Sequence, residues 1–177
     1  MSSVITERGD LGETDLMYGR RVAKTHPRIV TNGSLDELNA MVGLVRVYSK
    51  DHPSVPQRMA ELQGQLIQIM GEIATLPEDQ ERYRTQFGVL GNSEVINLTH
   101  EARELENDLN TRFSDWAIPG EHAHPGSAYL DMARTLCRRA ERELLTLPED
   151  ERPQNVARYL NRLSDFLWLV ARQIERE

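Results

Sequence analysis

Several arginines and one glutamate stand close together between residues 134 and 142. Arg134, Arg138 and Glu141 follow at steps of four and three residues, which places them on one face of a helix, while Arg139 points elsewhere. Guanidinium groups bind phosphate oxygens bidentately and stay charged at every physiological pH. The face is therefore either an anion-binding surface or a solvated helix surface with intrahelical ion pairs, and a second element has to decide between them.

The N-terminal segment is a candidate for that second element. Residues 6–14 read TERGDLGET, where Gly9 and Gly12 would let backbone N–H groups converge on an anion, and Lys24 adds a positive charge nearby. The segment has neither the Gly-Lys-Ser/Thr ending of a P-loop nor the glycine spacing of a dinucleotide-binding loop. Taken alone, the pattern fits a phosphate site or a surface turn that packs the N-terminus against the rest of the chain.

Composition limits the partners of these charges. The 177 residues carry 21 Lys and Arg against 28 Asp and Glu, a net charge of −7, which argues against a broad electrostatic interaction with nucleic acid or a membrane. The longest apolar run, residues 166–171, is far shorter than the roughly 20 residues of a membrane span. Because Cys137 is the one cysteine, we expect a cytoplasmic protein, with a single domain over residues 1–177.

Five segments repeat apolar residues at alternating steps of three and four, the pattern of helices with one buried stripe. A capping box of Ser34 and Glu37 is expected to open the first. No segment shows sustained strand alternation, so the sequence predicts an all-α, five-helix antiparallel bundle over residues 34–177. Residues 1–33 and 78–91 are expected to lie outside its helices. The predicted helices cover residues 34–49, 54–76, 92–109, 126–144 and 154–174.

Five stretches, in order along the chain, resemble the ATP:cob(I)alamin adenosyltransferases of the propanediol-utilisation type. They are TERGDLGETDL, GRRVAK, LDELNAMVGLVR, ARTLCRRAER and YLNRLSDFLWLVAR. The resemblance implies a homotrimer of five-helix bundles that transfers the 5′-deoxyadenosyl group of ATP to cob(I)alamin, giving adenosylcobalamin and triphosphate. It also implies ATP with Mg²⁺ at each subunit interface, cobalamin beside it, and a reductase and an adenosylcobalamin-dependent enzyme as partners. The alternative is a trimer that binds a nucleotide or corrinoid and has lost the transfer activity.

The resemblance also assigns residues to roles. It implies that Arg138, Glu141 and Trp116 take part in catalysis, and that Asp36 and Arg134 form a salt bridge between subunits. The residues implied to bind ATP are Thr6, Glu7, Arg8, Gly9, Thr14, Asp15, Lys24, Arg138, Arg139, Glu141, Arg142 and Asn161.

Two regions depart from the family pattern. Glu7 and Arg8 replace a basic residue and a hydroxyl, and Asp15 brings a further negative charge towards the phosphates. In the longer loop WAIPGEHAHPG, Trp116 stands where the family has a phenylalanine that presses on the lower corrin face; the alternative is that Trp116 covers the end of the bundle. His122 and His124 could instead ligate cobalt or another metal, but their loop setting differs from the helical ligand motifs of metal-binding bundles.

Overall fold

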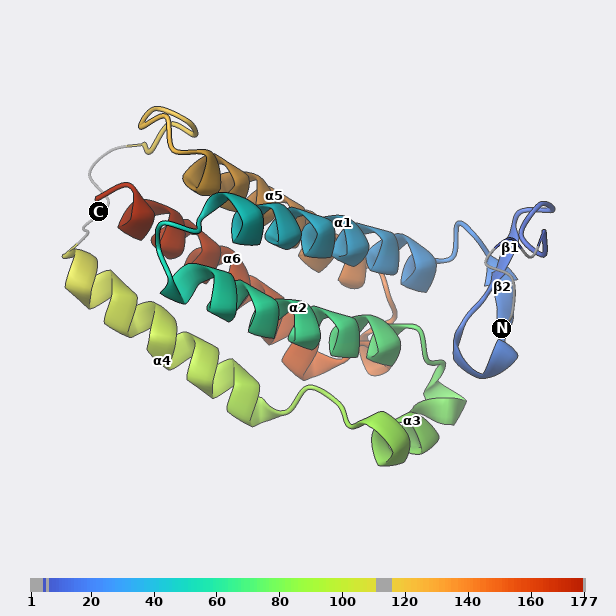
Figure 1. Cartoon of the computed structure of the whole chain (residues 1–177). Helices are drawn as coiled ribbons and strands as arrows, with labels where there is room; N and C mark the ends of the chain where they lie inside the picture. Colours follow the sequence, from blue (N-terminus) through green and yellow to red (C-terminus); the bar gives the residue numbers. More distant parts are fainter. Residues whose placement is uncertain (1–4, 6, 111–115, 177) are drawn as a thin grey trace.

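The computed structural model describes residues 5, 7–110 and 116–176. Five long helices lie side by side in it, with two short strands and a short helix at one end (Figure 1). The elements in chain order are β1 (Glu13–Asp15), the 3₁₀ turn η1 (Met17–Gly19), β2 (Arg21–Ala23), α1 (Pro27–Tyr48), α2 (Ser54–Ile73), η2 (Pro77–Asp79), α3 (Gln80–Phe87), α4 (Asn92–Leu109), α5 (Pro125–Leu144), η3 (Glu149–Glu151) and α6 (Gln154–Ile174).

The five long helices confirm the predicted antiparallel bundle. Helix α1 packs against α2 and α5, while α6 packs against α5 and α4. The apolar stripes meet in one core, which removes their surface from water and drives the packing. None of the described helices is both long and apolar enough to cross a membrane.

The start of α1 differs from the prediction. The helix begins at Pro27, which suits a first helical position because its missing N–H would have no partner there. Ser34 lies inside the helix, and its hydroxyl donates to Glu143 on α5. The predicted capping box is therefore wrong, and residues 27–33 belong to the bundle.

A short β-hairpin and a short helix were not predicted. Strands β1 and β2 pair antiparallel, with Thr14 opposite Val22, within a segment we call the N-terminal hairpin (residues 7–24). Helix α3 lies in the region 78–91 and docks through Tyr83, whose hydroxyl donates to the Gln68 carbonyl at 3.3 Å. A Cβ on Gly71 would come within 2.1 Å of that hydroxyl, so this close approach requires glycine.

The single cysteine belongs to the core between α5 and α6. Cys137 is fully buried, and its sulfur lies 3.2 Å from the Leu160 carbonyl oxygen. Burial raises the pKa of the thiol far above its usual value, because the thiolate would lose its hydration. The structure thus agrees with a packing role for this side chain.

Candidate functional site

The C-terminal half of α5 and the facing part of α6 bring one group of predicted site residues together. The Asn161 side-chain amide donates to Glu141 Oε1 at 3.1 Å, and its carbonyl oxygen accepts a hydrogen bond from Arg162. These two contacts fix the orientation of the amide. Arg138 lies one helical turn before Glu141, and Arg142 follows Glu141 directly. Both arginines are exposed.

Arg139 has a different environment from its neighbours. Its guanidinium forms an ion pair with Glu37 on α1. Arg139 thus points away from the face that carries Arg138, as its position in the helix predicted. The pair lies close to the contact between Ser34 and Glu143, so the two contacts together join α1 to α5. The ion pair uses one nitrogen of the guanidinium, Nη2, so the contact of Arg139 with ATP stays a prediction.

The hairpin brings Gly9 and Lys24 together. The Lys24 N–H donates to the Gly12 carbonyl at 2.8 Å, and a Cβ on Gly9 would come within 3.0 Å of the Lys24 ammonium. Glycine at position 9 thus lets the lysine side chain lie against the turn. Glu7 is exposed with a φ of 55°, whereas Thr6 lies outside the described residues.

Two of the three charges that depart from the family pattern, Arg8 and Asp15, pair with each other. Arg8 lies 3.2 Å from Asp15, and Arg21 lies within 3.5 Å of both Asp15 and Glu13. Arg21 also donates to the Arg8 carbonyl at 3.0 Å. Asp15 therefore brings no uncompensated negative charge towards a ligand, although pairs this exposed contribute little to stability.

The hairpin is attached to the region after α2. The Met17 N–H donates to the Ala74 carbonyl at 2.9 Å, and Arg20 binds Asp79 at 2.7 Å. The Tyr18 hydroxyl donates to the Gln86 side chain on α3 at 2.8 Å. The hydrogen bond from Arg20 holds the pKa of the Asp79 carboxyl below its usual value. The hairpin is thus supported by η2 and α3, whereas Arg138 and Glu141 are supported by the bundle.

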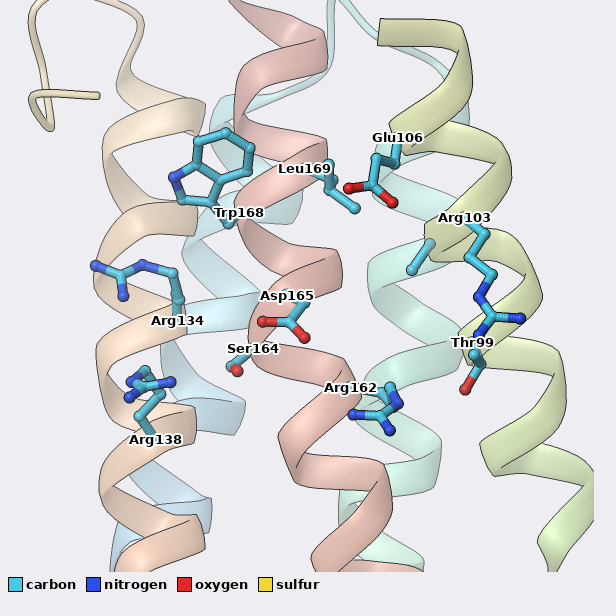
Figure 2. A pocket seen from close by; sticks show the side chains of 11 residues that line it. Thr99, Arg103, Glu106, Arg134, Arg138, Arg162, Ser164, Asp165, Trp168 and Leu169 are labelled. Atoms are coloured by element: carbon cyan, nitrogen blue, oxygen red, sulfur yellow. The ribbon is translucent and has the colours of Figure 1, made fainter. Parts of the chain in front are cut away.

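A groove of about 500 Å³ opens over α4, α5 and α6 (Figure 2). Arg134 and Arg138 form its α5 side, Trp168 and Asp165 come from α6, and Arg103 comes from α4. Partial burial raises the pKa of Asp165, while the nearby Arg162 and Arg138 act in the opposite direction. The groove combines an aromatic wall with several guanidinium groups, which suits a large ligand with both ring surface and anionic or amide groups.

The groove includes residues that sequence reasoning missed. Trp168 sits in an apolar stripe, where an aromatic side chain is indistinguishable from core, yet the structure leaves it half-buried at the groove. Arg103 stands in the middle of the chain, outside the five stretches that carry the family resemblance. Trp168 lies within the last of those stretches, so the family resemblance could have identified it.

The two residues of the predicted intersubunit pair occupy different surfaces of this chain. Asp36 is exposed on α1, whereas Arg134 lines the groove on α5. Arg134 approaches Asp131 at 4.0 Å, and Asp131 in turn accepts a hydrogen bond from Arg172 at 2.8 Å. The salt bridge between subunits stays a prediction.

Trp116 and the two histidines lie in the same loop before α5 but have different surroundings. Trp116 is 95% exposed, so the alternative in which it covers the bundle end is wrong for this chain. His124 Nδ1 accepts the Ser127 N–H at 3.3 Å and thereby caps α5, and His122 lies 3.9 Å from Glu175. Across the described residues there is no group of three or more His, Cys, Asp or Glu side chains arranged to hold a metal.

The curated proteins most similar in sequence that we compared are corrinoid or cobalamin adenosyltransferases. The chain is 36% identical over 174 residues to the corrinoid adenosyltransferase PduO of Citrobacter freundii, covering 96% of this chain and 49% of that protein. It therefore spans about half the length of the PduO relatives that it matches. The cobalamin adenosyltransferase of Cupriavidus metallidurans is 33% identical over 177 residues, covering 99% of this chain and 90% of the relative.

Solved structures agree with the sequence matches. A variant of the PduO-type ATP:corrinoid adenosyltransferase from Lactobacillus reuteri, complexed with cobalamin and ATP, superposes with a TM-score of 0.85 at 26% identity, covering 98% of this chain and 94% of that one. A second variant of that protein, complexed with ATP, gives a TM-score of 0.84. The family model described as cobalamin adenosyltransferase matches residues 4–174. The chain belongs to the cobalamin adenosyltransferase family.

Proposed function

We propose that this chain transfers the 5′-deoxyadenosyl group of ATP to cob(I)alamin and releases triphosphate. The cobalt–carbon bond forms with the electron pair of Co(I) as the bond from C5′ to the phosphate oxygen breaks, so the leaving triphosphate carries that bond's electron pair. The observation that carries the proposal is the position of Arg138 at the groove, one turn from the paired Glu141 and Asn161, in a member of this family.

The proposed roles follow from the charges. The reaction needs no general base, so the protein has to align C5′ with the nucleophile and stabilise the charge that develops on the triphosphate. Arg138 and Arg142 supply positive charge on α5, and Lys24 supplies it on the hairpin, beside the backbone amides of the Gly9 turn. Glu141, held by Asn161, is the acceptor for the ribose or for a water bound to Mg²⁺, which would enter with ATP.

We place the corrinoid in the groove over α4, α5 and α6. Trp168 offers ring surface, and the guanidinium of Arg103 can donate to the amide oxygens of the corrin side chains. Trp116 has an exposed indole that is available to reach a corrin face. A cytoplasmic setting, a reductase that supplies Co(I) and an enzyme that consumes adenosylcobalamin complete the proposal.

A homotrimer would complete the ATP site between subunits. In one chain the hairpin is attached to η2 and α3, whereas Glu141 and Asn161 are paired within the bundle. In the proposed trimer each half of the site faces its counterpart on a neighbour. Asp36→Arg and Arg134→Asp should each weaken assembly, and the double variant should restore it if the two side chains pair across the interface. Light scattering of the purified proteins measures this; fully trimeric single variants would show that the pair is incidental.

The activity itself is tested by mixing purified protein with ATP, Mg²⁺ and chemically reduced cob(I)alamin. Appearance of the adenosylcobalamin absorbance, against a protein-free control, is the expected result. The second candidate, a binding protein without transfer, is favoured by the pairing of Arg8 with Asp15, which occupies charge that ATP would otherwise meet. Folded protein that binds ATP or corrinoid and forms no product would support that alternative.

A further inference from the structure

Arg28 is a fully buried cation in the first turn of α1. This placement is unfavourable twice, because burial removes the guanidinium from water and because the N-terminal end of a helix carries partial positive charge. The side chain offsets both effects with three hydrogen bonds. It donates to the carbonyls of Ile73 and Thr75 at 3.1 and 3.0 Å, and to Glu151 Oε2 at 2.8 Å.

Two of these acceptors lie where α2 ends, because Ile73 is its last residue and Thr75 belongs to the turn that follows. The last carbonyls of a helix have no partner within it and carry partial negative charge, so Arg28 acts as a cap supplied by another helix. Gln80 contributes further bonds there, to the carbonyls of Glu72 and Thr75 at 3.0 and 2.8 Å. The turn that follows α2 is thus fixed from the inside by α1 and from the outside by α3.

The hairpin docks on this same turn. Ala74 stands between the two carbonyls that Arg28 binds, and its own carbonyl accepts the N–H of Met17 at 2.9 Å. Met17 lies between β1 and β2, the strands that follow Gly9 and precede Lys24. The contact to Ala74 therefore sets where those residues stand relative to the bundle.

We infer that Arg28 is a positioning residue for the nucleotide-binding hairpin. It fixes the turn that receives Met17, and through Glu151 it ties this turn to η3, the connection between the helices that carry Glu141 and Asn161. The inference rests on the proposed function, since the hairpin matters to the degree that it binds ATP. Arg28 is buried and was not among the predicted site residues, yet in this proposal it controls the affinity for ATP.

The test uses Arg28→Lys in the full chain. Lysine keeps the charge but has no planar fork to reach both carbonyls and Glu151 together. We expect the Kd for ATP to rise about tenfold, the scale of losing one hydrogen bond to a charged group, with the Kd for cobalamin unchanged. Amide hydrogen exchange at Met17 should also become faster, because its acceptor turn is loosened.

Arg58→Lys is the matched control. Arg58 is a partly buried arginine that also uses its fork, here to bind Glu101 at 2.7 to 3.0 Å, but on the side of α2 that faces α4. It should leave the ATP Kd and Met17 exchange unchanged. Should Arg28→Lys fail to fold, Glu151→Gln, which spares both carbonyl contacts, is measured in the same way and should raise the ATP Kd by a smaller factor.

Unchanged ATP affinity and unchanged Met17 exchange in a folded Arg28→Lys protein would overturn the inference. So would equal losses of ATP and cobalamin affinity, which would mark a general structural role. If the unmodified protein binds no ATP, the proposed function fails; faster Met17 exchange in Arg28→Lys would then still support the anchoring of the hairpin, and unchanged exchange would refute it.

Discussion

The hairpin and the C-terminal half of α5 carry the two halves of the predicted ATP site, and they are held in different ways. In the hairpin, Leu16 is the buried side chain among residues 7–24, and polar contacts such as Arg20 to Asp79 attach it. In α5, Cys137 and Ala140 are fully buried in the shared core. Water competes for the first kind of contact and is excluded from the second, so we expect the hairpin to open at a lower free energy than the bundle.

The largest expected effect comes from the core beneath α5. Leu160→Ala removes a fully buried side chain on α6 next to Cys137, and we expect the free energy of unfolding to fall by about 2–5 kcal/mol. Urea denaturation followed by circular dichroism measures this. Ile67→Ala, at a side chain that is 60% exposed, is the control and should change little. Equal effects of the two would mean that α5 is not held by core packing.

Arg138→Ala tests the rigid half without disturbing its support. The side chain is exposed at the groove, so stability should be kept while kcat/KM for adenosyl transfer falls by about 10²–10³-fold, the loss expected for one electrostatic donor. Arg46→Ala, an exposed arginine on α1 that pairs with Gln63, is the control. Unchanged turnover at saturating ATP would remove Arg138 from the site.

The smallest effect is expected at the hairpin, and it depends on pH. Arg20 lowers the pKa of Asp79 from its ordinary 3.8, so this pairing is fully present above that value and is lost as the pH falls through the lowered one. Acidification should therefore reduce exchange protection at Met17 before the bundle unfolds. Asp79→Asn should lower protection at neutral pH and remove the acid step. If exchange protection at Met17 followed that of the bundle core at every pH, the hairpin and the bundle would not differ in stability.

The sequence predicted those parts of the fold that repeat. Leu35, Leu38 and Val42 recur at three and four residues, which is enough to identify α1 as a helix. Its first turns were missed, because Thr31 and Ser34 interrupt the apolar stripe, although the fold buries both. Strands of three residues are too short to show alternation, so the hairpin had no detectable period.

The candidate site divides in the same way. Arg138 and Glu141 share one helix, so their spacing alone placed them together. The contact between Glu141 and Asn161 depends on how α5 packs against α6, and residue spacing says nothing of that. Arg28 could not be recognised, because an arginine in a sequence looks exposed until the fold supplies it with acceptors.

The buried state of Cys137 has a practical consequence. A thiol reacts with maleimides and similar reagents as the exposed thiolate, and this side chain is neither exposed nor easily deprotonated. The single native cysteine should therefore stay unmodified while the protein is folded. Ile118→Cys would place one reactive handle on the loop before α5 and leave Trp116 in place, so a spin label or fluorophore there could report directly on the arrival of the corrinoid.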